Sequence, residues 1–376
     1  MRTVIIMGIA DTYSRGRKIA IERPGVLLVA LVAVVLVADL ARQFSTGDVQ
    51  VHDIGSLVWD GLMRGLVIGL AGIGLSMTYS ILNFANFSHG DYITAGAFSG
   101  WATTYLIAGL ARPNADLGSL LLVGAGGSVF GGALGIGVLG TPLAVVLGLV
   151  IAGAFTIVLS LGVDRFIYKP IRDEDGITLL ITSIGVAFAL RYLMQFVFGS
   201  DVRGTTAQPP QIGPYLWDGQ VFISAHDIAL VVVAGGLMLG VHVLLQTTKL
   251  GKAMRAMADN EDLARITGIP TERVVRSVWI IGGGLTGVAG YMFVLWKGTL
   301  GFNDGWLLLL LIFAAVILGG IGSIYGAIAG GLVIGLTASL SVIWIPSAFA
   351  RAAAFLVMIV ILLVKPQGIF AGRSTA

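Results

Sequence analysis

Residues 251–276 read GKAMRAMADNEDLARITGIPTERVVR, the longest strongly charged run in a chain that is otherwise overwhelmingly apolar. Apolar segments flank this run on both sides, at residues 228–245 and 277–295. Each of them is close to the ~20 residues that a helix needs to cross a bilayer. The pattern predicts a folded element that lies outside the membrane, between two membrane-spanning helices.

The charged run carries the start and stop signals of one short helix. Asn260 can cap its first turn, and Glu261 and Asp262 follow at the end where the helix dipole favours anions. Gly268 suits the left-handed residue that ends many helices, and Pro270 follows two residues later. These signals predict a helix of about two turns.

A helix this short is expected to need a docking partner. Isolated helices below ~12–15 residues are marginal in water, even for good helix formers. Leu263 and Ile266 are the apolar side chains that could anchor it on such a partner. The alternative is an ordinary solvated loop between two spans, which the charge pattern by itself allows equally well.

Composition predicts an all-α, polytopic transmembrane helical bundle. Of the 376 residues, 56% are hydrophobic and 11% are charged, whereas a typical soluble domain is about 25% charged. No long polar linker divides the chain, so we expect one transmembrane domain over residues 1–376. The 54 glycines fit this class because small residues let membrane helices approach closely. Cysteine is absent, which excludes disulfides, thiolate metal sites and a cysteine nucleophile.

Apolar segments and basic residues together predict the topology. Lys and Arg favour the cytoplasmic side, and most of the 23 lie in segments that face the cytoplasm if the N-terminus does. We therefore expect residues 1–23, residues 251–276 and both termini in the cytoplasm. A cleaved secretory signal peptide is the alternative to a first helix. Ten spans are expected, at residues 26–38, 57–79, 91–110, 143–162, 177–197, 227–245, 277–295, 301–319, 325–343 and 349–364.

Residues 111–141 form an insertion between the third and fourth expected spans. Within it, residues 117–140 are glycine-rich, apolar and long enough to be mistaken for an eleventh span. Another crossing would place the basic residues of 251–276 on the outer side, against the charge rule. We therefore expect a non-spanning insertion on the outer side.

Charged side chains within the spans have both a structural and a functional explanation. Asp60 and Arg64 are four residues apart on one helical face, which favours an ion pair near the outer interface. Arg191 has no such local partner, and its burial costs ~2.5–3.5 kcal/mol on an insertion scale. It is expected to face the bundle interior and meet a carboxylate or backbone carbonyls. A packing role and a pathway role are equally open for Arg191.

Polar residues also crowd a break between two spans, at residues 83–92, NFANFSHGDY. Asn86, His89 and Asp91 belong to this cluster, and Gly90 lets the backbone bend. We expect it near the cytoplasmic interface, where a helix starts. The cluster fits a cap for that helix as well as a translocation pathway.

Catalytic and nucleotide-binding motifs are missing from the sequence. The Gly251-Lys252 pair is followed by Ala and lacks the upstream glycine of a P-loop, so this chain is not expected to bind ATP. The four histidines show no paired metal spacing. A stand-alone secondary transporter would carry ion-coupling carboxylates in mid-membrane, whereas the acidic residues here are near span ends or in loops. A membrane enzyme and a secondary transporter stay open as the less supported classes.

Several segments, in the right order over about residues 57–370, resemble the permease subunits of ABC importers of the branched-chain amino acid type, in particular the LivH kind. The ordered set is far more specific than any one motif. The segments are NFSHGD at 86–91, YKPIR at 168–172 with TSIG at 182–185, GKAMRA at 251–256 with Ala264, Gly268 and Ile269, LGGIGS at 318–323 with Gly326, and KPQGIF at 365–370. The sequence departs from the family at Asp91, where Glu is usual, in an extra Asn-Phe-Ala before the first motif, and in the insertion.

This resemblance implies the ABC importer permease fold, with residues 251–276 as the coupling loop that docks in a groove of a cytoplasmic ATPase subunit. It implies no catalytic or metal site. The coupling residues are then Arg255, Ala256, Asn260, Glu261, Leu263, Ala264, Ile266, Gly268 and Ile269. The translocation pathway would involve Asn86, His89, Asp91 and Arg191.

The resemblance also implies partners and a location. A subunit of this kind lies in the lipid bilayer of the cell membrane and works with two cytoplasmic ATP-binding subunits, which hold the ATP. It is joined by a second permease subunit of the LivM kind or a second copy, and by an external solute-binding protein. No cofactor on this chain and no nucleic acid are expected. The solute is a branched-chain or related amino acid, with urea or a short amide as the alternative.

Overall fold

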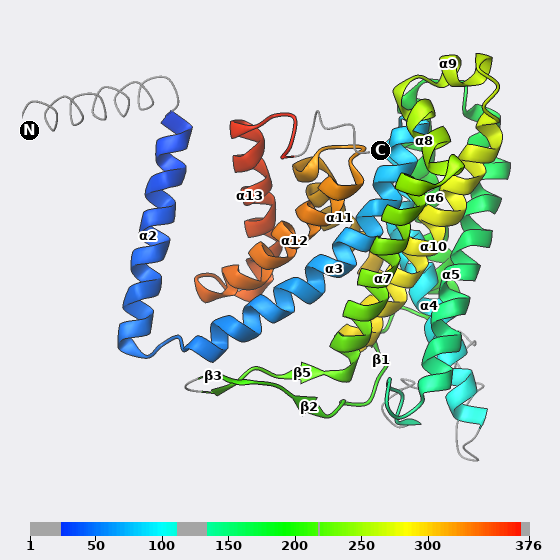
Figure 1. Ribbon diagram of the computed structural model, residues 1–376. Coiled ribbons are helices and arrows are strands. Elements are labelled where there is room, and N and C mark those ends of the chain that lie inside the picture. The colour runs from blue at the N-terminus through cyan, green and yellow to red at the C-terminus, as the bar shows by residue number, and fades with distance from the viewer. Residues whose placement is uncertain (1–23, 111–133, 217–218, 370–376) are drawn as a thin grey trace, which may run out of the picture.

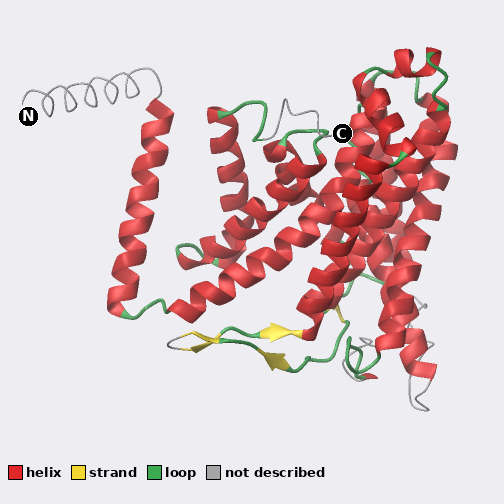
Figure 2. Cartoon of the chain, in the orientation of Figure 1, coloured by secondary structure: helices red, strands yellow, loops and turns green. Residues whose placement is uncertain are grey.

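Helices occupy every segment where a span was expected. The computed structural model describes residues 24–110, 134–216 and 219–369. Its long helices are α2 (Pro24–Thr46), α3 (Val51–Leu82), α4 (His89–Leu110), α5 (Pro142–Val163), α6 (Gly176–Phe198), α7 (Ala225–Thr247), α10 (Thr271–Lys297), α11 (Asp304–Gly319), α12 (Ile324–Leu340) and α13 (Ala350–Val364). The predicted all-α class is confirmed (Figure 2).

Length and composition confirm a polytopic membrane protein. Within the described residues, seven helical segments are long and apolar enough to cross a membrane. Four of them are α3, α6, α7 and α10. The other three are α5, α12 and α13 together with the short helical turns beside them, as Pro142–Ile171, Ile324–Ile343 and Ser347–Val364. The apolar helix α11 is shorter, with 16 residues. The count of ten spans therefore stays a prediction, although all ten helices are present.

The central helix of the bundle is α3, which runs diagonally through it (Figure 1). It packs on α12 over most of its length and also contacts α7, α10 and α11. Glycines permit the close approach of α3 and α12. A Cβ atom at Gly331 would lie 2.7 Å from Gly69 Cα, and one at Gly335 would lie 2.6 Å from Gly65 Cα. Larger residues there would force the two helices apart.

A second group of tightly packed helices consists of α4, α5 and α10. A Cβ atom at Gly96 of α4 would lie 2.9 Å from Thr156 Oγ1 of α5. Near the other end of α4, Thr104 Oγ1 lies 3.2 Å from the Ala144 carbonyl oxygen and 2.6 Å from Tyr291 Oη. The last turns of α4 and the first turns of α5 therefore lie side by side at one end of the bundle.

Residues 251–276 contain two short helices, not one. Helix α8 (Lys249–Asp259) precedes the expected α9 (Glu261–Ile266), and both lie at the same end of the bundle (Figure 1). Helix α8 was not predicted. Its two buried methionines, Met254 and Met257, fix it on the bundle, where it contacts α3, α7 and α10.

Short antiparallel strands form the opposite end, beneath the start of α3 (Figure 1). They pair as β1 with β6, β2 with β5, and β3 with β4. Most of them belong to the connection between α6 and α7. Their bounds are β1 (Arg203–Gly204), β2 (Gln211–Ile212), β3 (Tyr215–Leu216), β4 (Gly219–Gln220), β5 (Ile223–Ser224) and β6 (Thr299–Leu300).

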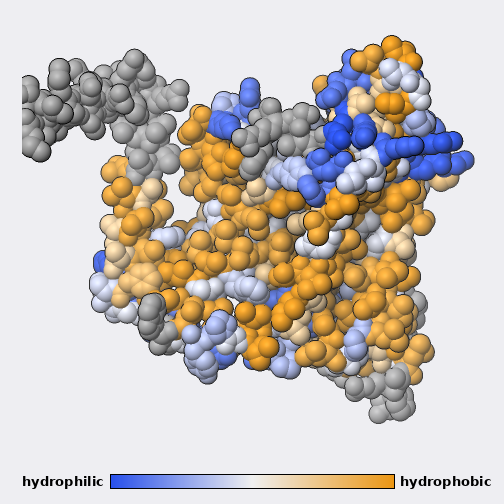
Figure 3. Space-filling model, viewed as in Figure 1, coloured by the Kyte–Doolittle hydropathy of each residue, from blue (hydrophilic) through white to orange (hydrophobic). Residues whose placement is uncertain are grey.

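The surface has the polarity of a membrane protein. Hydrophobic side chains cover the flank of the bundle, while hydrophilic ones gather over the end that carries α8 and α9 (Figure 3). Apolar residues of α5 and α7, such as Val150 and Val232, are exposed, as lipid contact requires. The charged end and the strand end are therefore the two faces that meet water.

Two predicted segments lie largely or wholly outside the described residues. The expected cytoplasmic segment 1–23 lies wholly outside them. Of the expected insertion 111–141, residues 111–133 lie outside them. The described part of the insertion, residues 134–141, contains a short turn and leads into α5.

Candidate functional site

The first candidate site is the surface of α8 and α9. Local sequence fixes the ends of α9, because Asn260 Oδ1 accepts a hydrogen bond from the Leu263 amide at 2.8 Å. At the other end, Gly268 is left-handed with φ +88°, and the Ile269 amide donates to the Ala264 carbonyl at 3.0 Å. These are the cap and the stop that the sequence predicts.

Helix α9 exposes two apolar side chains and buries a third. Leu263 is 56% exposed and Ile266 is 81% exposed, whereas Ala264 is only 2% exposed. Ala264 belongs to the same buried cluster as Met254 and Met257 of α8. Helix α9 thus packs against α8 and α10, buries Ala264 and presents Leu263 and Ile266 outward.

Two residues of the expected coupling set pack within this chain, and the coupling role of the set stays a prediction. Ala264 packs inside this chain, and Arg255 Nη1 donates to the Leu245 carbonyl at 2.9 Å, where it braces the end of α7. Glu261 pairs with Arg265 one turn along α9, at 2.9 Å. Ala256 and Ile269 are half-buried, while Asn260 and Gly268 cap the ends of the helix. Sequence periodicity over six residues does not distinguish which face of α9 docks inward.

Salt bridges join this end of the bundle to the YKPIR segment. Glu272, in the first turn of α10, pairs with Lys169 at 2.9 Å and with Arg172 at 3.0 Å. Arg172 also pairs with Asp164 at 2.6 Å. The segment that follows α5 is therefore tied to the helix that directly follows α9.

A second candidate site is the buried pair Asp91 and Arg191, which the structure brings together from α4 and α6. Arg191 Nε and Nη2 donate to the two carboxylate oxygens of Asp91 at 3.1 and 2.9 Å. The two side chains are 0% and 8% exposed. Trp306 of α11 covers the guanidinium at 4.4 Å from the ring centroid. Arg191 does face the bundle interior and meets a carboxylate there, as its cost in a membrane requires.

Two helices show how deep this pair lies. Arg191 is 15 residues beyond Gly176, the start of α6, which is roughly 22 Å of helix. Asp91 lies at the level of Gly305 of α11, because a Cβ atom at its neighbour Gly90 would lie 2.9 Å from the Gly305 carbonyl oxygen. Gly305 in turn is 14 residues, roughly 21 Å, before the end of α11. Both distances run from the end that carries α8 and α9, and they place the pair near the middle of the bundle.

Residues 83–92 therefore run from the α8/α9 end of the bundle toward its middle. A Cβ atom at Gly176, the first residue of α6, would lie 3.2 Å from the Asn83 carbonyl oxygen, whereas Asp91 meets Arg191 deeper inside. The expected place near the cytoplasmic interface fits the first residues of the cluster only, and it stays a prediction. Asn83 ends α3 in a left-handed conformation with φ 53°. Residues 84–88 then run into the bundle, and α4 begins inside it at His89. Polar partners in the interior make this possible, and hydropathy along the chain does not reveal them.

His89 and Asn86 hold this inward segment by hydrogen bonds. His89 Nε2 lies 2.9 Å from the Ala71 carbonyl oxygen of α3. Asn86 Oδ1 accepts from the amide and the hydroxyl of Ser88, at 3.0 and 2.6 Å. The Ser88 hydroxyl also lies 2.8 Å from Tyr168 Oη of the YKPIR segment. These bonds fix the residues that lead into α4, and both a helix cap and a translocation pathway stay open for the cluster.

The TSIG segment meets the same cluster. Ser183 Oγ accepts a hydrogen bond from the Phe87 amide at 3.0 Å. Asp175 caps the helix that carries this segment and accepts bonds from the Thr178 hydroxyl and amide, at 2.7 and 2.9 Å. These bonds hold the pKa of the Asp175 carboxyl below its ordinary value. Three motif segments that are far apart in the sequence thus converge at the start of α4.

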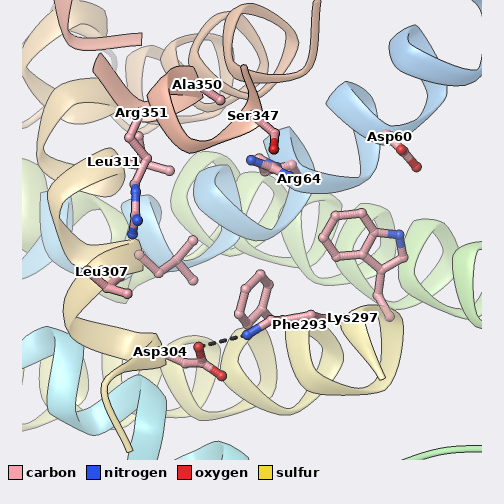
Figure 4. A pocket seen from close by; sticks show the side chains of 12 residues that line it. Asp60, Arg64, Phe293, Lys297, Asp304, Leu307, Leu311, Ser347, Ala350 and Arg351 are labelled. Carbon is pink, nitrogen blue, oxygen red and sulfur yellow. Dashed lines mark hydrogen bonds and ion pairs between the residues drawn. The ribbon is translucent and has the colours of Figure 1, made fainter. Parts of the chain in front are cut away.

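A third candidate site is a cavity of about 610 Å³ between α3, α10, α11 and α13 (Figure 4). We call it the charge-lined cavity. Five charged side chains reach it from those four helices, and apolar side chains line the rest of the wall. The lining residues are Asp60, Arg64, Phe293, Trp296, Lys297, Asp304, Leu307, Leu308, Leu311, Ser347, Ala350 and Arg351.

The expected ion pair between Asp60 and Arg64 does not form. Within the described residues, neither side chain makes a salt bridge, although both line the cavity. Lys297 and Asp304 do pair, at 2.8 Å. Sequence analysis missed the cavity because its charges come from distant parts of the chain. The sequence does carry one signal for this cavity: Arg351 lies within an apolar span, and Lys297 lies next to one.

A second polar cavity of about 550 Å³ adjoins the first at the strand end of the bundle. It is bounded by Gln208, Gln211 and Phe222 of the strand connection. Asp60, Trp296 and Lys297 line both cavities. None of the four expected pathway residues, Asn86, His89, Asp91 and Arg191, lines either one.

Comparisons with known proteins agree with the motif segments. The family model for the permease component of branched-chain amino acid transport systems matches residues 57–364. The chain is 29% identical to the high-affinity branched-chain amino acid transport system permease protein LivH of Escherichia coli K12, over 83% of this chain and 94% of that protein. It is 26% identical to BraD of Pseudomonas aeruginosa, over 85% of this chain and 95% of that permease. No solved structure matches the chain significantly.

Proposed function

This chain belongs to the family of branched-chain amino acid transport system permease components, and from that membership we propose which solute and which partners it serves. It is a multi-pass membrane permease subunit of an importer. The proposed solute is a branched-chain or related amino acid, which an external binding protein delivers. Two cytoplasmic subunits bind and hydrolyse ATP, and a second permease subunit of the LivM kind, or a second copy, completes the membrane part.

The observation that carries the ATP-driven function is the exposed pair Leu263 and Ile266 on α9. Helix α9 has six residues, too few to be stable alone, and in this chain it packs against α8 and α10. Its outward apolar surface lies at the hydrophilic end of the bundle, where lipid cannot cover it. A cytoplasmic ATP-binding subunit is the partner that we assign to this surface.

The topology that we propose follows from the same end of the bundle. Helix α2 begins, and α13 ends, on the side where α8 and α9 lie (Figure 1). Basic residues are concentrated on that side, which supports a cytoplasmic location for both termini and for residues 251–276. The adjacent ends of α4 and α5 support an outer, non-spanning position for the insertion.

Uptake by the assembled importer tests this function. The chain is reconstituted in liposomes with its ATP-binding subunits, companion permease and binding protein, and labelled leucine and urea are supplied outside. We expect leucine uptake that requires ATP. Urea uptake without leucine uptake would support the alternative solute, and uptake without ATP would support a secondary transporter.

A further inference from the structure

Three charged side chains in the charge-lined cavity have no partner within the described part of the chain. Asp60, Arg64 and Arg351 make neither a hydrogen bond nor an ion pair there. Lys297 and Asp304, in the same wall, neutralise each other at 2.8 Å. Asp60 and Arg351 are exposed and Arg64 is half-buried, so all three side chains can reach a ligand in the cavity. Charged side chains at membrane depth often mark a substrate pathway.

These side chains combine both signs of charge in one space. Asp60 and Arg64 are one turn apart on α3, and Arg351 extends from α13 across the cavity from them (Figure 4). A carboxylate can accept from an ammonium group, and two guanidiniums can donate to one carboxylate. A ligand that satisfies all three must carry a cationic and an anionic group close together.

We propose that the charge-lined cavity binds the zwitterionic backbone of a free amino acid during its passage through the permease. Asp60 receives the α-ammonium group, and Arg64 and Arg351 bind the α-carboxylate. This assignment rests on the proposed import of amino acids and names the groups that recognise them. It makes these three side chains determinants of specificity within the membrane subunit.

The rest of the cavity fits an aliphatic side chain. Leu307 and Leu311 form an apolar wall along α11, opposite the charges of α3 (Figure 4), and Leu308 also lines the cavity. The cavity volume of about 610 Å³ lies within the ~300–1,000 Å³ of small-molecule sites. The adjoining polar cavity, which shares Asp60, gives access from the strand end.

A neutral solute would use this cavity poorly. Urea or a short amide has no full charge to offer, so it would leave the guanidiniums and the carboxylate uncompensated. An amino acid that has lost either charged group would satisfy only part of the set. Selectivity against such analogues is therefore the property by which this site can be recognised.

Direct binding to the complete importer tests the proposal. The complex is purified in lipid nanodiscs without binding protein or nucleotide, and ligand-observed NMR follows titrations with L-leucine, L-leucinamide and 4-methylpentanoate. We expect wild type to bind leucine about tenfold more tightly than either analogue, since each loses one charged contact. Asp60→Asn should bind leucine no more tightly than 4-methylpentanoate, which lacks the ammonium group. Arg351→Gln should bind leucine no more tightly than leucinamide, which lacks the carboxylate.

Matched controls separate recognition from assembly. Asp201→Asn and Arg42→Gln make the same chemical changes in described residues that do not line the cavity. They should leave all three affinities unchanged. Retention of the ATP-binding subunits on purification shows that each variant assembles.

Three outcomes would overturn the charge-lined cavity as an amino acid site. The first is that wild type binds leucine and its analogues equally. The second is that Asp60→Asn and Arg351→Gln keep the selectivity of wild type. The third is that these variants assemble poorly while the complexes that do form stay selective. The last would assign the charges to the contact with a companion permease. Leucine uptake by wild type decides the proposed function independently of these results.

Discussion

Arg191 and Asp91 show what one buried pair can do at the residue scale. The guanidinium binds both carboxylate oxygens near the middle of the bundle and is covered by Trp306. The pair joins α4 to α6 but lines neither polar cavity. Its geometry favours positioning the start of α4 over contact with the solute.

Arg191→Met should therefore lower the amount of folded protein. The change leaves the Asp91 carboxylate buried without a partner, which costs about 3–5 kcal/mol. Membrane abundance and uptake should fall in parallel. The double variant Asp91→Leu with Arg191→Met should recover much of both, because it removes the two charges together. Quantitative immunoblotting and uptake measured on the same membranes check this.

Normal abundance of Arg191→Met with abolished uptake would contradict the positioning role. It would return the pair to the translocation pathway that the sequence analysis considered. Arg191→Lys is the informative companion, since it keeps the charge but loses the two-pronged geometry.

At the scale of elements, α9 should act as the docking helix. Leu263→Asp removes one of its two exposed apolar side chains and adds a charge to the surface. Burial of such a side chain is worth roughly 1.5–3 kcal/mol, so association with the ATP-binding subunit should weaken at least about tenfold. Membrane abundance should stay normal because the site is outside the bilayer. Co-purification and uptake are the measurements.

Arg265→Gln is the matched control for this variant. It changes an exposed residue of the same helix without removing apolar surface. If Leu263→Asp co-purifies with the ATP-binding subunits as wild type does and keeps full uptake, α9 is only a solvated loop segment. Ala264→Trp is not a usable probe, because Ala264 is buried inside this chain.

The contact between α3 and α12 provides a second prediction at this scale. Gly335→Ala places a methyl group about where it would meet Gly65 Cα at 2.6 Å, and it should reduce folded protein strongly. Gly236→Ala on α7 has nothing within 4 Å of the new methyl group and should be tolerated. Thermal unfolding of the two purified variants compares them. Equal stability would show that α3 and α12 can separate without cost.

Local signals explain which elements could be predicted. The long apolar runs predict the spans, and Asn260 and Gly268 predict the ends of α9, since caps depend on neighbouring residues. The inward path of residues 84–88 could not be predicted, because it depends on Ala71, Ser183 and Tyr168, which come from other elements.

The candidate sites were predictable to different degrees for the same reason. A buried carboxylate partner for Arg191 follows from the cost of its charge. That Asp60 and Arg351 line one cavity could not be predicted, because 291 positions separate them and no local pattern links them. The inward direction of Ala264 also depends on α8, which was not predicted.

At the scale of the whole molecule, we expect the end that carries α8 and α9 in the cytoplasm and the strand end outside. The charge-lined cavity and the short strands then face the source of solute, and α8 and α9 face the source of ATP. The salt bridges of Glu272 and the cluster around Tyr168 connect α9 with the start of α4. The cytoplasmic orientation of α9 and its contact with an ATP-binding subunit therefore decide how the two ends work together.

Accessibility of a single thiol at position 266 measures both that orientation and that contact. The chain has no native cysteine, so Ile266→Cys introduces the one reactive site, at a position that is 81% exposed. A membrane-impermeant maleimide should label it in inside-out vesicles but not in intact cells. Addition of the ATP-binding subunits should protect it. Labelling from outside the cell, or labelling in inside-out vesicles that the assembled ATP-binding subunits do not reduce, would contradict the account.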